Sequence, residues 1–334
     1  MTEFLVLALT LVAGLTLLSH WGKKNRGAEV SLILALLFVS LLILGFGALL
    51  SAGMLLFSVV ETREIGGSTV TPAMVAFILI SAGLAGLALC VPPLLKVLGR
   101  PPKHPFWSDP PIFFALWLFA MVLSYNLANL ILFEYVADAL TLSEESRISP
   151  GLVLASQLPL VVVALVGVGV GVRRGPRETL ARLGYGPVSP RQLGVVFLFI
   201  LGAFGLTSVA DHLFVTLQPE LYERVGEVSD ALFNPEGLEP LTAVLFALLL
   251  GFGAGAGEET LFRGAVQPVF GIALTSILFA SMHIQYGPSV LLGYIFILSL
   301  GLGLLRKRIN TTASFLAHSG YNASSVLLAY FFGV

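Results

Sequence analysis

Long apolar stretches, each close to the length of a helix that crosses a bilayer, recur along the whole chain. A transmembrane helix needs about 20 mainly apolar residues. Hydrophobic residues make up 57% of the 334 residues and charged residues only 11%, whereas soluble domains carry about 25% charged residues. The sequence therefore predicts an all-α polytopic membrane protein with about nine or ten transmembrane helices and a catalytic C-terminal helix bundle. The candidate helices cover residues 2–21, 30–60, 73–98, 111–137, 151–172, 193–216, 241–262, 271–285, 288–305 and 311–333.

Two of these stretches leave the topology open. The eighth is short, and Gly287-Pro288 interrupts the apolar pattern directly after it. Residues 271–305 therefore form either one broken span or two. The first stretch begins Met1-Thr2-Glu3 without basic residues, and no small cleavage-site residues follow it. We expect an anchor helix with its N-terminus outside rather than a cleaved signal.

Basic residues are distributed unevenly between the loops that connect these stretches. With ten spans, one alternating set of loops holds 15 of the 18 basic residues, and the exceptions are Arg63, Arg147 and Arg224. Cytoplasmic loops carry the excess of Lys and Arg, so the basic set is predicted to be cytoplasmic. We expect an integral protein of the cell membrane. The net charge of −1 gives no indication of nucleic-acid binding.

The organisation along the chain changes at a basic segment rich in glycine and proline. We predict an N-terminal transmembrane region of about five helices (1–172), a cytoplasmic linker (173–192) with a short helix at 178–183, and a C-terminal domain (193–334). The long acidic segment 217–240 is expected to be an outside loop, either solvated or folded over the helices. The intramembrane Glu and His candidates all fall in the C-terminal domain.

The most unusual polar group is Glu258-Glu259-xxx-Arg263, at the end of an apolar run. A carboxylate at mid-bilayer costs about 2.5–3.5 kcal/mol even on the lenient insertion scale. Residues four apart share a helix face, so Glu259 is predicted to pair with Arg263. Glu258 points about 100° away on a regular helix and has no local partner. This asymmetry indicates a structural Glu259–Arg263 pair and a chemical role for Glu258.

Two further polar clusters interrupt the following apolar stretches. The first ends in Phe279-xxx-His283, and the second is His318-xxx-Asn322, whose two side chains share a helix face. Counting residues from the basic loops places Glu258, His283 and His318 at similar depths in the cytoplasmic half of the membrane. We therefore expect the three clusters to converge.

Other functions also use buried polar groups. A lone intramembrane His more often forms an interhelical hydrogen bond than a catalytic site. Buried Glu and His also build the proton relays of ion-coupled transporters, although the sequence has no inverted repeat. A third alternative is a non-catalytic immunity or scaffold protein.

The order Glu-Glu-xxx-Arg, Phe-xxx-His and His-xxx-Asn over about 190–334 resembles the type II CAAX prenyl endopeptidase family, also called CPBP, which comprises intramembrane proteases. The resemblance implies a hydrolase in which Glu258 activates a water molecule and His283 helps to orient it. It further implies that His318 and Asn322 stabilise the oxyanion, with Glu259 and Arg263 in support. The implied substrate is a hydrophobic, membrane-associated peptide or protein, with or without a lipid group.

Metal involvement is open on the sequence alone. Two His and one carboxylate are a familiar catalytic zinc set, so a zinc ion would be held by Glu258, His283 and His318. The usual His-Glu-x-x-His helix is absent, and a metal-free glutamate mechanism uses the same residues. We expect no obligatory, tightly bound metal. The single cysteine, Cys90, provides neither a disulfide framework nor a Cys-based zinc site.

Overall fold

The computed structural model describes residues 2–57, 63–65, 68–70, 72–99, 105–141, 149–233 and 238–333. Over these ranges the chain is predominantly helical, which confirms the all-α membrane fold class. A short antiparallel pair, β1 (Arg63–Ile65) and β2 (Ser68–Val70), is the exception among the described residues. The chain separates into two compact units, residues 1–142 and 143–334.

In the first unit, helices α2 and α3 pack along one another. Their shared core includes Leu36 and the fully buried Cys90, and Trp117 donates from Nε1 to Ser40 Oγ at 3.1 Å. The predicted stretch 111–137 is divided at Leu132 into two helices. The elements are α1 (Thr2–Gly22), α2 (Arg26–Phe57), α3 (Pro72–Val97), η1 (Pro105–Trp107), α4 (Pro110–Ile131) and α5 (Phe133–Thr141).

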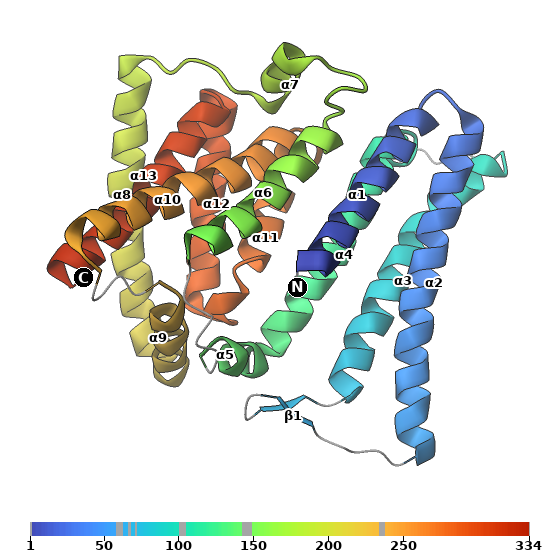
Figure 1. Cartoon of the computed structure of the whole chain (residues 1–334), viewed down its shortest axis with the longest axis horizontal. Helices are drawn as coiled ribbons and strands as arrows, with labels where there is room; N and C mark the ends of the chain where they lie inside the picture. The colour runs from blue at the N-terminus through green and yellow to red at the C-terminus, as the bar shows by residue number, and fades with distance from the viewer. Residues whose placement is uncertain are drawn as a thin grey trace. The chain divides into compact units, whose positions relative to one another are not determined.

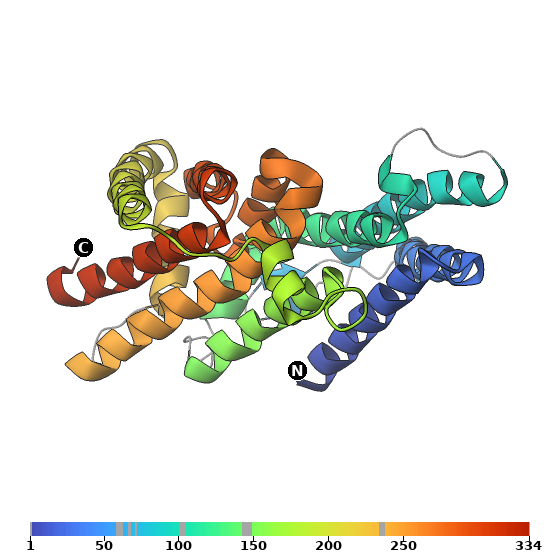
Figure 2. The ribbon, with the colours of Figure 1, turned by 90° about the horizontal axis from the view of Figure 1, so that it is seen from above.

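The second unit contains the residues of the predicted site. In it α10 lies between α6 and α13, and α12 packs against α8, α11 and α13. Figures 1 and 2 both show α10 running along α6. The elements are α6 (Pro150–Gly167), α7 (Pro176–Leu183), α8 (Pro190–Leu217), α9 (Pro219–Phe233), α10 (Pro240–Glu258), η3 (Glu259–Val266), α11 (Gln267–Ser281), η4 (Ile284–Tyr286), α12 (Val290–Arg308) and α13 (Thr311–Phe332).

Local sequence explains where helices of this unit begin and end. Proline occupies the start of α7, α8 and α10, where its missing N–H and fixed φ cost nothing. Before α8, Ser189 and Gln192 form a capping box. The predicted short helix in the linker is present as α7, and it ends at Gly184, whose φ of 78° is in the left-handed region.

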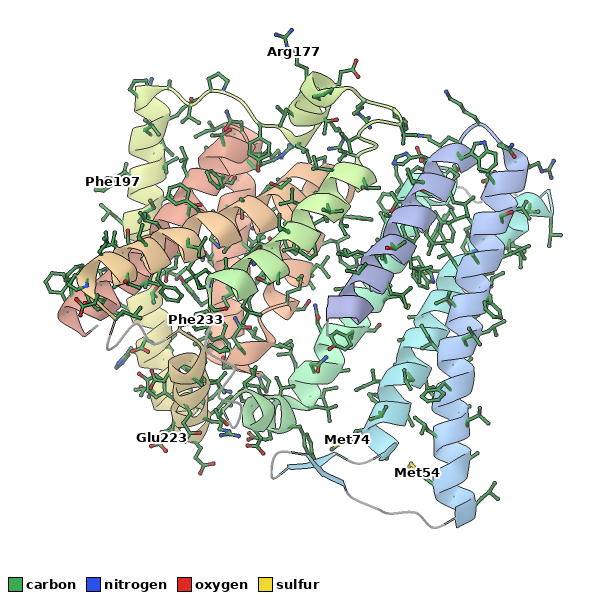
Figure 3. The ribbon with its side chains drawn as sticks, in the orientation of Figure 1. Met54, Met74, Arg177, Phe197, Glu223 and Phe233 are labelled. Atoms are coloured by element: carbon green, nitrogen blue, oxygen red, sulfur yellow. The ribbon has the colours of Figure 1, made fainter. Side chains whose placement is uncertain are left out.

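Seven helical runs among the described residues are long and apolar enough to cross a membrane. The difference from ten has three sources. The apolar part of α1 (Val6–Gly22) is shorter, α13 is not among the seven, and Pro240–Ser281 forms one run where we predicted two. Large apolar side chains of these helices face outward. Phe197 on α8, for example, is 60% exposed and points away from the bundle (Figure 3), as expected for contact with lipid.

Glycines let α10 approach its neighbours closely. A Cβ added at Gly251 would lie 2.6 Å from the Ser319 carbonyl oxygen of α13, and one added at Gly255 would lie 2.1 Å from Ser319 Oγ. On the opposite side, a Cβ at Gly257 would lie 2.2 Å from Gln157 Oε1 of α6. Small residues four apart are the usual means of bringing membrane helices together. Glu258 therefore directly follows a closely packed stretch of α10.

The structure corrects one expectation about the connections between helices and decides another that was open. The segment 217–240 is not a plain loop, because its described part forms the helix α9, which buries Val225, Val228 and Leu232. The region 271–305 contains two separate helices, α11 and α12, that pack against each other across η4. The predicted break before residue 271 is instead a kink within a helical run, at Gly271 with φ 78°.

The boundary predicted at residue 172 differs from the division into compact units. Residues 143–172 belong to the second unit, because α6 packs against α10 and η3. The helix before the linker thus helps to hold the segment that carries the predicted site.

Candidate active site

The predicted carboxylate pair lies where the helix changes its winding. The helix α10 ends at Glu258, and the next eight residues form the π-helical segment η3. At its end the Gln267 N–H donates to the Phe262 carbonyl, five residues back instead of the four of an α-helix. Such turns are rare and occur frequently at functional sites.

Glu259 and Arg263 form the predicted pair, and both side chains are fully buried. Arg263 Nε lies 3.2 Å from Glu259 Oε2, although the alignment is too poor for a hydrogen bond. The guanidinium also donates from Nη2 to Ser299 Oγ on α12 at 3.0 Å and lies 4.9 Å above the Phe279 ring. Each buried charge therefore has a compensating partner, which burial in an apolar bundle demands.

His318, on α13, connects the two carboxylates. Its Nδ1 lies 3.0 Å from Glu259 Oε1, and its Nε2 lies 4.0 Å from Glu258 Oε2. We assign the proton to Nδ1, because an ionised carboxylate can only accept. In the neutral ring Nε2 is then an acceptor that faces a second acceptor, Glu258. A water molecule or an additional proton between them would relieve this contact.

His283 follows the end of α11. Its Nδ1 lies 2.9 Å from the Phe279 carbonyl, so Nδ1 donates and Nε2 keeps its lone pair. The Phe279 ring packs against both imidazoles, with centroid distances of 4.9 Å to His283 and 5.9 Å to His318. The Phe-xxx-His spacing thus places one aromatic ring between the two histidines. Glu258 and His318 both lie within electrostatic range of His283.

The last predicted residue, Asn322, lies one turn after His318 on α13 and is partly buried. Its side chain forms no hydrogen bond with the residues that the structure describes. Glu258 is similar, since its side chain is 16% exposed and its Oε2 has no hydrogen-bond partner among them. The structure thus gathers Glu258, Glu259, Arg263 and His318 directly, with His283 close by.

A strap of residues 182–186, which the sequence analysis treated as linker, packs on this group. The Tyr185 hydroxyl lies 2.6 Å from Thr260 Oγ1, next to Glu259. Arg182 donates to the Gly264 carbonyl at 3.0 Å, and Thr311 bonds to the strap through both its Oγ1 and its N–H. The signal for this strap is weak in the sequence, because one Tyr between glycines also fits a solvated turn.

The zinc ligands named from the sequence do not form a preformed metal site. Over the described ranges, no three His, Cys, Asp or Glu side chains gather in a way that could hold a metal ion. Zinc binding by Glu258, His283 and His318 therefore remains a prediction, which metal analysis of the purified protein can test.

Comparison with known families bears on the same segment. Residues 240–324 match the family model described as Rce1-like, type II CAAX prenyl endopeptidase. This match contains all six residues predicted for the site and supports a protease-type function in general. Comparison with curated proteins and with solved structures gave no match.

Proposed function

We propose that this protein is an intramembrane endopeptidase in which Glu258 activates the attacking water. One observation carries the proposal. Within the segment that matches the protease family, Glu258 Oε2 has no hydrogen-bond partner among the described residues and faces His318 Nε2 at 4.0 Å. A carboxylate that is free to accept a proton can act as the general base for an attacking water molecule.

In the proposed reaction, Glu258 takes a proton from the water while the water oxygen bonds to the peptide carbonyl carbon. His283 Nε2 accepts the second water proton in a hydrogen bond and so fixes the direction of attack. The proton on Glu258 is then given to the leaving nitrogen as the carbon–nitrogen bond breaks. Proton transfers of this kind contribute about 10²–10⁴-fold to the rate.

The negative charge on the former carbonyl oxygen needs donors. Asn322 offers a neutral side-chain N–H₂, and a doubly protonated His318 offers Nε2–H. Glu259 at Nδ1 supplies the negative charge that stabilises such a cation. Removing one donor of this type typically costs about 10²–10³-fold in kcat.

The substrate we propose is a hydrophobic peptide or protein segment, with or without a lipid group, that reaches the site from the bilayer. The exposed apolar side chains of the surrounding helices support this route. The site is proposed to face the cytoplasm, because η3 packs against α7 and its basic connections.

The test compares full-length wild type with Glu258→Gln in proteoliposomes, using hydrophobic peptides and lipopeptides and mass spectrometry of the products. Glu223→Gln is the matched control, since Glu223 lies on α9 and points away from the bundle (Figure 3). We expect cleavage by wild type and by the control, and a loss of at least about 10²-fold in Glu258→Gln. Equal turnover in Glu258→Gln would overturn the assignment of the base. Proton flux without cleavage would instead favour a transporter.

A further inference from the structure

Three arginines lie around η3, where two of them donate to its carbonyl groups and the positive charge of the third acts on one of these two. Arg174 follows α6, Arg182 is in the last turn of α7, and Arg306 is in the last turn of α12. Each guanidinium donates to one backbone carbonyl: Arg174 to Val168, Arg182 to Gly264 and Arg306 to Arg263. We refer to Arg174, Arg182 and Arg306 as the arginine cluster.

The geometry keeps Arg182 and Arg306 close together. Arg182 Nη1 and Arg306 Nε each lie 3.0 Å from the carbonyl oxygens of consecutive residues, Gly264 and Arg263. A Cβ added at Gly184, two residues after Arg182, would lie 3.4 Å from Arg306 Nη2. Burial and the positive charges of Arg174 and Arg306 lower the pKa of Arg182.

Within the part of the chain that the structure describes, the arginine cluster has no acidic partner. Among the described residues none of its three members forms an ion pair. The nearby carboxylate of Glu178 is directed to the N–H of Gly175, at the start of its own helix. All three side chains are partly buried, so the repulsion between them is only partly screened. Each side chain uses one donor for its bond to a backbone carbonyl, whereas a guanidinium has five.

We propose that the arginine cluster binds the phosphate of an anionic membrane lipid. Arg306 lies in the last turn of an apolar helix that can cross the membrane, which ends at Arg308. The cluster thus lies at the level where lipid phosphates meet the ends of transmembrane helices. Guanidinium groups bind phosphate with paired N–H donors, and the cluster keeps such donors unused. The bound phosphate joins α7, η3 and α12, the elements that surround the carboxylate pair.

The test measures binding of a fluorescent phosphatidylglycerol to the detergent-solubilised full-length protein at high ionic strength, with phosphatidylcholine, which is zwitterionic and has no net charge, as the competitor. High salt reduces the Debye length to about 3 Å at 1 M, which suppresses general attraction to a basic surface. We expect Arg182→Gln/Arg306→Gln to weaken binding by roughly fivefold for each charge removed. The control, Arg177→Gln/Arg308→Gln, removes two exposed charges and is expected to bind like wild type; Arg177 points away from α7 (Figure 3).

The variant Arg182→Lys/Arg306→Lys distinguishes a folding defect from a loss of phosphate binding. It keeps both positive charges and one donor to each carbonyl but lacks the forked guanidinium groups. It is expected to keep the wild-type thermal stability and still bind the lipid more weakly. Unchanged binding by the Gln variant, or an equal loss in the control, would overturn the proposal. Displacement by inorganic phosphate as effective as that by phosphatidylglycerol would overturn the assignment to a lipid. The assay measures binding alone, so its outcome is independent of the proposed peptidase activity.

Discussion

Glu258 and Glu259 are neighbours in the sequence and have opposite surroundings. Glu259 is fully buried and held by Arg263 and His318. Glu258 is partly exposed, and its Oε2 has no hydrogen-bond partner among the described residues. A carboxylate fixed by two partners is poorly suited to exchange protons with a substrate, whereas one without such bonds is available for it. This difference supports the proposed division, in which Glu259 holds the site and Glu258 transfers protons.

The buried ion pair predicts a large stability effect at residue scale. Arg263→Met removes the cation and leaves Glu259 as an uncompensated buried charge, which costs about 3–5 kcal/mol. Arg308→Met, at an exposed position, is the control and is expected to stay within about 0.5 kcal/mol of wild type. The measurement is thermal unfolding in detergent.

Removing both charges tests the reason for that effect. Glu259→Gln/Arg263→Met eliminates the unpaired charge, so the double variant is expected to recover part of the lost stability. If Arg263→Met unfolds at the wild-type temperature, the pair does not have the role described. The same holds if the double variant is no more stable than Arg263→Met.

At the scale of elements, the strap 182–186 holds η3 through a short side-chain contact. Thr260 donates its one hydroxyl proton to the Ala256 carbonyl, so the Tyr185 phenol is the donor to Thr260. Burial and the charge of Glu259 raise the pKa of Tyr185. The phenol therefore keeps its proton, and this bond persists, throughout the neutral pH range.

Tyr185→Phe tests whether the strap positions the site. Loss of one hydrogen bond costs about 0.5–1.5 kcal/mol. We expect kcat to fall by several-fold while KM changes little, since the carboxylates shift and the substrate surface stays intact. Thr260→Val should produce the same loss, and the double variant should lose little more. Wild-type kcat in Tyr185→Phe, or a change in KM alone, would contradict a positioning role.

Some structural elements can be predicted from their local sequence, and others cannot. The spacing of Glu259 and Arg263 was sufficient to predict their pair, because i, i+4 contacts depend only on local geometry. The helix α9 was missed because its acidic residues suggested a solvated loop, although Val225, Val228 and Leu232 follow helical spacing. The π winding of η3 was not predictable, since the contacts that favour it come from α6, α7 and α13, far away in the sequence.

At the scale of the whole molecule, the bounds of α8 place the basic and acidic segments of the second unit at opposite ends of one helix. α7 precedes α8 and α9 follows it. The 28 residues of α8 span about 42 Å, more than the roughly 30 Å hydrocarbon core. The basic α7 end, against which η3 packs, is thus predicted to be cytoplasmic and the acidic α9 end to be outside.

Cysteine labelling tests this orientation. The only native cysteine, Cys90, is fully buried, so a Cys90→Ala background is expected to retain the fold and to label little. Arg177→Cys should react with a membrane-impermeant reagent only after the cytoplasmic face is opened. Glu223→Cys should react in intact cells. Labelling of both from the same side, or the reverse order, would contradict the proposed topology.

The central proposal is that Glu258, as the base for the attacking water, and His318, as a donor to the oxyanion, act as a single unit. The most direct measurement is kcat for Glu258→Gln, His318→Ala and the double variant, compared with wild type on one cleavable peptide. Groups that act as a unit are strongly non-additive. We predict that each single variant loses about 10²–10⁴-fold and that the double variant loses little more. Wild-type kcat in either single variant, or losses that multiply in the double variant, would contradict the claim.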